Sequence, residues 1–299
     1  MGKIAFVFSG QGDQYPGMGK ELAERYPAAA QVYALCDRLR PGTSAQCFNG
    51  TEEELKETQN TQPCLFAMEL AAASVLQETG VIPSAVAGFS LGEVVAATVS
   101  GLLDREAGFT LVCKRGMLMQ REAEVLDTAM AAVVKLTAEQ VQTICDRFTE
   151  VYPVNFNCPG QITVSGLSSQ MAGVFAAVKA AGGRAIPLKV RGAFHSPFMK
   201  AAADAFAEEL AKVEIGEPTV PLYSNMTAAP YTGDAVGLLS RQICHPVQWE
   251  ALIRRMVADG IDTFIEIGPG KTLTNMIPKI HAEVRAVSVS EYLAEVTAC

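Results

Sequence analysis

Hydrophobic and polar positions follow two different periods along the chain. Strand-length apolar runs occupy residues 4–8 and 85–89, whereas residues 18–39, residues 63–79 and the stretch from about residue 91 repeat apolar side chains at helical spacing. Apolar strands separated by helices are typical of a parallel sheet with helices on its faces. The first third of the chain is therefore predicted to form an α/β domain.

The middle of the chain has a different order of elements. Short strand-like runs enclose two helical stretches, the first of them capped at Thr137, in the order β-α-β-β-α-β. The strand-like runs are residues 131–135, 153–156, 162–164 and 185–190, and the second helix is residues 169–181. This order is typical of a ferredoxin-like unit.

Strand-like runs resume after this unit, at residues 220–224, 263–267 and 284–289. The simplest organisation is a small domain inserted into a larger one. We predict an α/β fold in which residues 1–125 and 192–299 form a large α/β-hydrolase-like domain around a parallel sheet. Residues 126–191 are predicted to form the small ferredoxin-like (βαββαβ) domain.

The chain is long enough for two hydrophobic cores, and it is acidic. It has 299 residues, 49% of them hydrophobic, and its 24 Lys and Arg against 32 Asp and Glu give a formal net charge of −8. Broad binding to nucleic acid or to an anionic membrane depends on excess positive charge, so neither is expected. The most apolar stretch, residues 85–103, contains Glu93, which favours a buried strand and helix over a membrane span.

Neither a secretion signal nor a metal site is apparent in the sequence. The N-terminal apolar run is only strand-length and continues into Gly-rich sequence, so a cytoplasmic location is expected. The eight cysteines are scattered without a Cys-x-x-Cys pair, which is typical of reduced thiols. The three histidines, at positions 195, 245 and 281, lack partners at ligand spacing apart from the adjacent Cys244, so no bound metal is expected.

The sequence Gly-Phe-Ser-Leu-Gly at residues 88–92 follows an apolar strand and precedes a helix. In this context G-x-S-x-G predicts a sharp strand-to-helix turn that presents Ser90 as a nucleophile at the helix N-terminus. The next backbone N–H then faces a developing oxyanion, and the helix dipole favours negative charge there. The alternative is a Gly- and Ser-rich turn without chemistry.

A serine nucleophile needs a base, and His195 is the best candidate. It lies in the sequence Gly-Ala-Phe-His-Ser-Pro at residues 192–197, where the chain leaves the inserted unit and returns to the large domain. A single histidine in an apolar and aromatic segment is also common as a structural residue. His245, which precedes a proline, is interpreted as a loop residue.

Eight short blocks, in order along nearly the whole chain, resemble the malonyl-CoA:acyl-carrier-protein transacylase family, the acyltransferases of fatty-acid and polyketide synthesis. The blocks are FSGQG (8–12), GFSLGE (88–93), RG and MQ (115–120), NFNCPGQ (155–161), GAFHS (192–196), YSN (223–225), RQ and PVQW (241–249) and EIGPGK (266–271). Each block alone is a weak signal, whereas eight in the same order are specific.

The resemblance implies a ping-pong transfer. Ser90 would attack the thioester of malonyl-CoA, and the phosphopantetheine thiol of an acyl carrier protein would then take the acyl group, with His195 as the base and later the acid. By resemblance, the backbone N–H groups of Leu91 and Gln11 form the oxyanion hole, and the backbone carbonyl of Gln242 orients the histidine. The CoA thioester is the substrate, and no bound cofactor is implied.

Arg115 carries the expectation about the substrate. Alone, the pair formed by Lys114 and Arg115 on a helix is equally typical of a solvated surface. By resemblance, Arg115 would bind the free carboxylate of the malonyl group in bidentate fashion. The sequence departs from the family where Ser9 replaces the usual proline and Phe89 replaces the usual histidine. The second change removes a polar ring beside the nucleophile, at a position that bears on acyl-group selectivity.

An acidic carrier protein would be repelled by a chain of net charge −8 unless positive charge is concentrated locally. Between residues 179 and 200 there are five basic residues and no acidic one: Lys179, Arg184, Lys189, Arg191 and Lys200. We expect part of this stretch, near Lys189, Arg191 and Lys200, to bind the carrier protein or the CoA phosphates. The alternative is a chance run on a solvated face.

Other functions stay open from the sequence. A hydrolase on the same scaffold would resolve the acyl-enzyme with water, and a transacylase for a different acyl-CoA would use the same residues. An ordinary α/β-hydrolase fits less well, because its histidine comes late and after an acidic residue. A binding module without chemistry would be expected to lose Ser90, His195 or Arg115. The pathway, the carrier protein and the oligomeric state are not determined.

Overall fold

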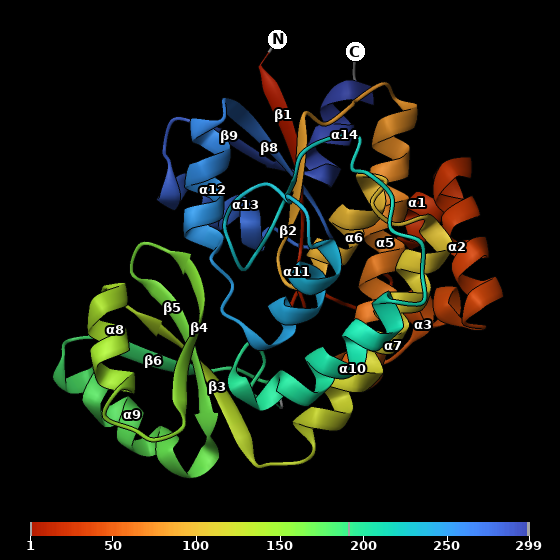
Figure 1. Ribbon diagram of the computed structural model, residues 1–299. Helices are drawn as coiled ribbons and strands as arrows, with labels where there is room; N and C mark the ends of the chain where they lie inside the picture. The colour runs from red at the N-terminus through yellow and green to blue at the C-terminus, as the bar shows by residue number, and fades with distance from the viewer. Residues whose placement is uncertain (1, 191, 298–299) are drawn as a thin grey trace.

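The computed structural model describes residues 2–190 and 192–297, and in this part of the chain the strands form two sheets (Figure 1). The larger sheet has the order β7-β2-β1-β8-β9, and every neighbouring pair is parallel. Its strands are β1 (Lys3–Phe8), β2 (Ala85–Gly88), β7 (Leu222–Tyr223), β8 (Ile261–Ile267) and β9 (Arg285–Ser288). The parallel sheet predicted from the alternating periods is confirmed.

Helices cover both faces of this sheet. Figure 1 shows α12 and α13 on one side of this sheet and α5 and α6 on the other. Phe6 and Phe8 of β1 belong to one core with α2, α5, α6 and α7, whereas Ala5 and Val7 belong to a second core with α12 and α13, as expected from the alternation of side chains along a strand. The helices of the large domain are α1 (Lys20–Arg25), α2 (Pro27–Leu39), α3 (Thr43–Asn49), α4 (Glu52–Lys56), α5 (Thr58–Glu78), α6 (Gly92–Val99), α7 (Arg105–Ala123), α10 (Lys200–Leu210), α11 (Ala235–Arg241), α12 (Trp249–Ala258), α13 (Thr272–Ile280) and α14 (Val289–Thr297), with short 3₁₀ helices η1 (Pro197–Met199) and η2 (Gln242–Cys244).

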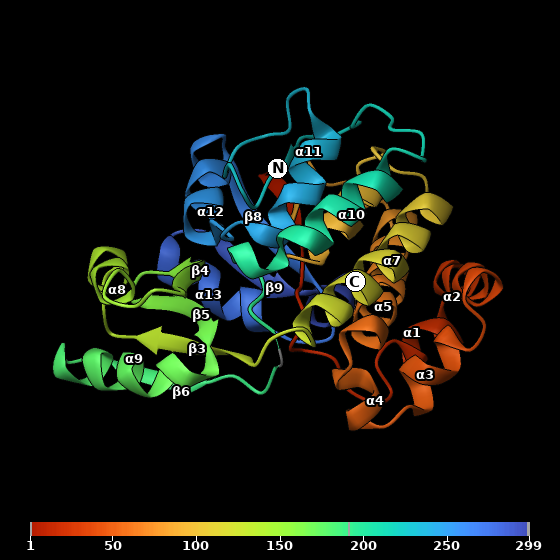
Figure 2. The same ribbon diagram turned by 60° about the horizontal axis from the view of Figure 1, so that its bottom comes forward.

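The smaller sheet is antiparallel and has the order β4-β5-β3-β6. Its elements follow one another as β3 (Thr128–Val134), α8 (Ala138–Cys145), β4 (Val151–Cys158), β5 (Gln161–Leu167), α9 (Ser168–Ala180) and β6 (Arg184–Pro187). The two helices pack on one face around a separate core. In Figure 2 these elements lie together on one side of the molecule, apart from α1 to α5. The order and the pairing confirm the ferredoxin-like unit.

The N-terminus of α8 follows the predicted cap. The Thr137 side chain accepts a hydrogen bond from the backbone N–H of Gln140 (3.3 Å), and the Gln140 side chain accepts one from the backbone N–H of Thr137 (2.9 Å). This reciprocal capping box satisfies two backbone donors that the helix itself leaves unpaired.

Two predicted helices have different limits in the structure. The helix expected over residues 18–39 is broken, because Tyr26 is extended before Pro27 and a second helix begins at that proline. The helix expected to begin at Pro63 begins at Thr58, whose backbone N–H is capped by the side chain of Gln120 (2.9 Å). The strand expected over residues 185–190 ends at Pro187, although the Leu188 N–H still donates to the Met130 carbonyl (2.9 Å).

The small sheet is attached to the large domain by its edge strand β4. The backbone N–H of Val247 donates to the Val154 carbonyl (2.8 Å), and the N–H of Phe156 donates to the Val247 carbonyl (2.9 Å). Met130 and Val154 therefore face the core of the large domain. The domain boundaries at residues 126 and 191 stay a prediction. Within the described ranges, no helix is both long and apolar enough to cross a bilayer.

Candidate active site

The turn between β2 and α6 carries Ser90 at the carboxyl end of the parallel sheet. Ser90 has a φ of 55°, in the left-handed region that side chains disfavour. The glycines on either side are sterically required: a Cβ on Gly88 would lie 1.9 Å from the backbone carbon of Gly92, and one on Gly92 would lie 2.4 Å from the Phe8 carbonyl oxygen. The G-x-S-x-G sequence thus forms the sharp turn expected of a nucleophile.

His195 faces this serine from the segment that returns from the small domain. Its Nε2 lies 2.7 Å from Ser90 Oγ, and its Nδ1 lies 2.8 Å from the backbone carbonyl oxygen of Gln242. A carbonyl oxygen can only accept, so Nδ1 carries the proton and Nε2 is free to accept the serine hydroxyl proton. Three residues predicted from the sequence therefore meet in a line of two hydrogen bonds.

Burial determines the protonation state of the histidine. His195 is 3% exposed, and its burial, together with the nearby Arg115 cation, lowers its pKa to about 4. The imidazole is therefore neutral at neutral pH, which is the state in which it can accept a proton.

Arg115 is fully buried beside the same serine oxygen. Its guanidinium donates to the side-chain oxygens of Gln62 (2.9 Å) and Gln242 (2.9 Å), and it lies 3.3 Å from Ser90 Oγ. Burial lowers its pKa to about 10, opposed by the nearby Glu93, so the group is still a cation at neutral pH. Lys114, the preceding residue on α7, is exposed, so the interpretation of both residues as one solvated pair is wrong for Arg115.

Two glutamine side chains complete the site, and the sequence did not point to them. Gln62 on α5 binds the guanidinium, and the Gln242 side chain binds the guanidinium and also donates to the Ser90 carbonyl oxygen (2.9 Å). The sequence assigned only the backbone carbonyl of Gln242. No local pattern distinguishes Gln62 from other polar residues on a helix, because its partner lies 53 positions away in the chain.

A cavity of about 90 Å³ opens beside Ser90 and is lined from both domains. The predicted residues Gln11, Leu91, Arg115 and His195 all line it. The small domain contributes Met130, Asn155, Leu188 and Val190. Such a volume suits a short acyl group rather than a long chain.

Phe89 and Ser9, the two departures from the family pattern, have identifiable contacts. Phe89 lines the cavity and packs edge-on against Trp249, with ring centroids 5.5 Å apart. Ser9 lies two residues before Gln11, and its hydroxyl donates to the buried carboxyl group of Glu69 (2.5 Å). Burial raises the pKa of Glu69 well above its usual value, which favours its uncharged form where it holds the start of the loop.

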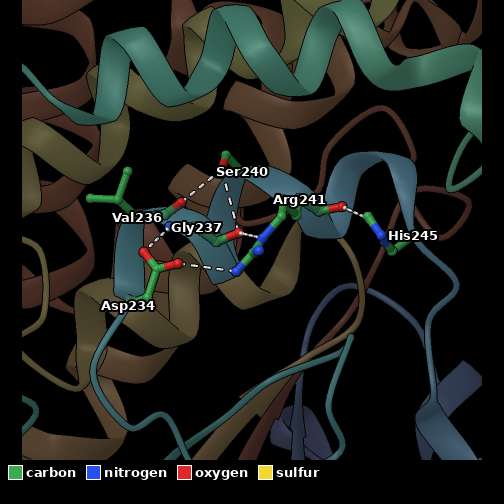
Figure 3. Close-up of polar contacts among 6 residues, drawn as sticks. All are labelled: Asp234, Val236, Gly237, Ser240, Arg241 and His245. Carbon is green, nitrogen blue, oxygen red and sulfur yellow. Dashed lines mark hydrogen bonds and ion pairs between the residues drawn. The ribbon is translucent and has the colours of Figure 1, made fainter.

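The second histidine near the site has a structural position. In Figure 3 the His245 ring points to the backbone carbonyl of Arg241, to which its Nδ1–H donates (2.8 Å). The Arg241 side chain in turn pairs with Asp234 (3.0 Å) and donates to the Gly237 carbonyl (2.9 Å). These contacts link α11 to η2, the short helix that presents Gln242.

Residues 5–296 match the family model described as the acyl transferase domain. The chain belongs to the malonyl-CoA:acyl-carrier-protein transacylase family. This acyltransferase is 39% identical to the malonyl CoA-acyl carrier protein transacylase of Bacillus subtilis, over 97% of the chain and 94% of the relative. It is 38% identical to the protein of the same name from Escherichia coli K12, over 97% of each.

Solved structures agree with this assignment. The malonyl CoA-acyl carrier protein transacylase of Clostridium perfringens has a TM-score of 0.94 to this acyltransferase at 34% identity, covering 99% of this chain and 98% of the other. A malonyl-transacylase described in complex with a type II polyketide synthase acyl-carrier protein has a TM-score of 0.95 at 35% identity, with 99% and 98% covered.

The basic stretch of this acyltransferase is less positive than its sequence indicates. Lys200 forms an ion pair with Asp204 one helical turn later (2.7 Å), so its charge is partly neutralised. Lys189 is exposed and directly follows Leu188, which lines the serine cavity. Arg191 lies outside the described residues. Within the described part of the chain, no three His, Cys, Asp or Glu side chains are grouped to hold a metal ion.

Proposed function

We propose that this acyltransferase moves a malonyl group from malonyl-CoA to the phosphopantetheine thiol of an acyl carrier protein by a ping-pong mechanism. The observation that carries the proposal is the convergence on Ser90 Oγ of a neutral histidine nitrogen at 2.7 Å and a buried guanidinium at 3.3 Å. One group activates the nucleophile, and the other matches a carboxylate near the acyl carbon. The names of the Bacillus and Escherichia relatives support the same reaction.

In the first half-reaction His195 Nε2 takes the hydroxyl proton as Ser90 Oγ bonds to the thioester carbonyl carbon. The backbone N–H groups of Leu91 and Gln11 stabilise the oxyanion; loss of one such donor typically lowers the rate about 10²–10³-fold. The carbon–sulfur bond then breaks, and the CoA thiolate leaves with the proton from His195. Gln242 keeps the proton on Nδ1 throughout, because its carbonyl is an acceptor only.

The second half-reaction repeats these steps with a different thiol. His195 removes the proton of the phosphopantetheine thiol, whose sulfur bonds to the malonyl carbonyl carbon. The tetrahedral intermediate breaks its bond to Ser90 Oγ, which recovers the proton from His195. The CoA thioester is the substrate of the cycle, and no redox step or bound cofactor takes part.

Arg115 selects the acyl group in this proposal. A malonyl carboxylate forms charge-assisted hydrogen bonds with the guanidinium and replaces its contact to the serine. An acetyl group has no carboxylate, so it leaves a buried cation with fewer partners. The two glutamine side chains hold the guanidinium toward the cavity.

The carrier protein approaches over the small-domain side of the cavity. Lys189 is exposed and lies in the chain between Leu188 and Val190, both of which line the cavity. Arg191 and Lys200 belong to the proposed binding surface, although the ion pair with Asp204 reduces the contribution of Lys200. An acidic partner is attracted to such a local excess of positive charge even when the whole chain is acidic.

Single-turnover acylation tests the proposed reaction. Labelled malonyl-CoA is mixed with excess protein, and the acyl-serine is chased with holo-carrier protein or with buffer alone. The expected result is rapid transfer to the thiol and slow hydrolysis. Rapid loss of label to water with or without the carrier protein would instead identify a hydrolase, and poor labelling by malonyl-CoA with good labelling by another acyl-CoA would identify a different donor.

A further inference from the structure

The strained backbone turn at Ser90 must be stabilised by contacts with surrounding residues. The left-handed backbone conformation of Ser90 is disfavoured for a residue with a Cβ, and the flanking glycines only leave space for the turn. Such a conformation persists when surrounding contacts over-determine it. The contacts that do so come from Asn225, which follows β7 and is fully buried.

The Asn225 side chain bridges the turn from one end to the other. Its Oδ1 accepts a hydrogen bond from the backbone N–H of Ser90 (2.6 Å), and its Nδ2 donates to the backbone carbonyl of Gly88 (2.5 Å). A backbone N–H can only donate and a carbonyl can only accept, so an acceptor and a donor are needed on one short side chain. The amide of asparagine supplies both at this length without a change of protonation state.

The backbone of Asn225 is itself hydrogen-bonded to two parts of the site, helix α6 and the segment that contains Gln242 and Gln248. Its backbone N–H donates to Glu93 Oε1 (3.2 Å) on α6, the helix that begins directly after the turn. Its carbonyl accepts from the backbone N–H of Gln248 (2.8 Å), in the segment that also presents Gln242. Asn225 therefore connects the nucleophile turn, through its side chain, to the segment that orients the histidine, through its backbone.

We propose that Asn225 is a positioning residue for the nucleophile: its side-chain amide holds the backbone from Gly88 to Ser90, so that the serine hydroxyl faces His195 and the next N–H faces the oxyanion. It touches neither the substrate nor the reacting atoms. The proposal rests on the proposed acyl transfer for its kinetic consequences, and on the turn geometry alone for its effect on serine reactivity.

The test compares Asn225→Ala and Asn225→Asp with Ser224→Ala. Ser224 is the buried neighbour whose hydroxyl accepts from the backbone N–H groups of Met226 (3.2 Å) and Thr227 (3.4 Å) and also interacts with Glu93, whereas Asn225 binds the backbone of Gly88 and Ser90 themselves. Both Asn225 variants are expected to lower the single-turnover acylation rate about tenfold or more, with the KM for malonyl-CoA within about twofold of the parent. Ser224→Ala is expected to lower the melting temperature while acylation stays within about twofold.

The pH dependence of acylation by the Asn225→Asp variant gives a second readout that needs only this one variant and the parent. As a protonated acid its side chain again offers one donor and one acceptor, and as a carboxylate it faces the Gly88 carbonyl without a donor. Its acylation rate relative to the parent is therefore expected to recover as the pH falls from 8 to 5.5. This comparison is available even if Asn225→Ala does not fold.

Labelling of Ser90 by a small fluorophosphonate separates this proposal from the proposed function. If malonyl-CoA acylates none of the proteins but the fluorophosphonate still reacts more slowly with the Asn225 variants, the positioning role holds and the acyl donor is wrong. Folded Asn225 variants with parent rates for both reagents, or equal loss of rate in Ser224→Ala, would overturn the positioning role.

Discussion

Burial shifts the pKa values of the ionisable side chains around Ser90 away from the usual values of their residue types. Burial lowers the pKa of His195 to about 4 and that of Arg115 to about 10, and it raises the pKa of Glu93 to about 8. At neutral pH His195 is therefore neutral and Arg115 is charged. In the proposed mechanism these are the states that let His195 accept a proton and Arg115 bind a carboxylate.

The lowered pKa of His195 predicts the acid limb of acylation. The base form predominates above the pKa, so the single-turnover acylation rate should stay level from pH 7 to about pH 5 and fall as the pH approaches about 4. Rapid mixing at saturating malonyl-CoA measures this pH dependence of the acylation rate, and circular dichroism verifies that the protein stays folded at each pH. His245→Gln is the matched control and should leave the limb in place. A midpoint near the usual histidine value would contradict the assignment.

Arg115 predicts selectivity between acyl groups. Arg115→Ala should lower malonyl transfer by about 10²-fold, because charge-assisted hydrogen bonds contribute about 1.5–3 kcal/mol each, and should affect acetyl transfer far less. Steady-state kcat/KM for both CoA esters measures the difference. Lys114→Ala removes the exposed neighbouring charge on the same helix and should change neither. Equal losses for malonyl and acetyl groups after removal of Arg115 would refute its role.

Among the elements, the β2–α6 connection is the one on which the site depends most. Parallel strands place their carboxyl ends at one edge, so β1, β2 and β8 end where the cavity opens. The close approach of Gly88 and Gly92 lets α6 begin directly above that edge. The same glycines make the connection intolerant of added atoms.

Gly88→Ala should therefore destabilise the protein strongly. Its Cβ would meet backbone atoms that cannot move independently, and a free energy of unfolding lower by about 3 kcal/mol or more is expected. Gly80→Ala is the matched control at a φ of 87° with open space, and it should cost only about 1–2 kcal/mol. Urea denaturation of the three proteins gives the comparison. A loss no larger than that of the control would contradict the steric requirement.

In the whole molecule, the two domains share one cavity, and their charges are unevenly distributed. The small sheet is tied to the large domain through Val247, and its uncovered face closes over the serine. Although the formal net charge is −8, the exposed Lys189 lies in the chain between Leu188 and Val190, which line this cavity. In the proposed function an acidic carrier protein is attracted to this edge of the cavity.

Charge reversal at this edge should weaken carrier-protein binding. Lys189→Glu, alone or with Arg191→Glu, should raise the KM for the carrier protein several-fold at low ionic strength and less at high salt, because screening removes the electrostatic contribution. The KM for malonyl-CoA in the absence of carrier protein serves as an internal reference. Lys20→Glu makes the same charge change on α1 and should have little effect. An unaltered carrier-protein KM at low salt would exclude this surface.

The parallel α/β pattern, the ferredoxin-like insertion and the nucleophile turn could all be predicted from the sequence, whereas short helices such as α3 and α4 were not. The predicted features follow from local properties: side-chain period, caps and glycine spacing act within a few residues, so they are visible along the chain. His195 was already the candidate base from its place in the sequence, and the resemblance of eight ordered blocks added the roles of Arg115, Gln11, Leu91 and the Gln242 carbonyl. The limits of the helices were less well predicted, as the break at Tyr26 illustrates.

The polar residues that surround Ser90 became visible only in the folded molecule. Gln62 reaches Arg115 across 53 positions, the Gln242 side chain reaches it across 127, and Asn225 reaches Ser90 across 135. A polar residue carries no local mark of a partner that distant, and burial, which lowers the pKa of His195 and Arg115, arises only when the chain folds. The chemistry of the site therefore depends on residues that are far apart in the sequence and are brought together by folding.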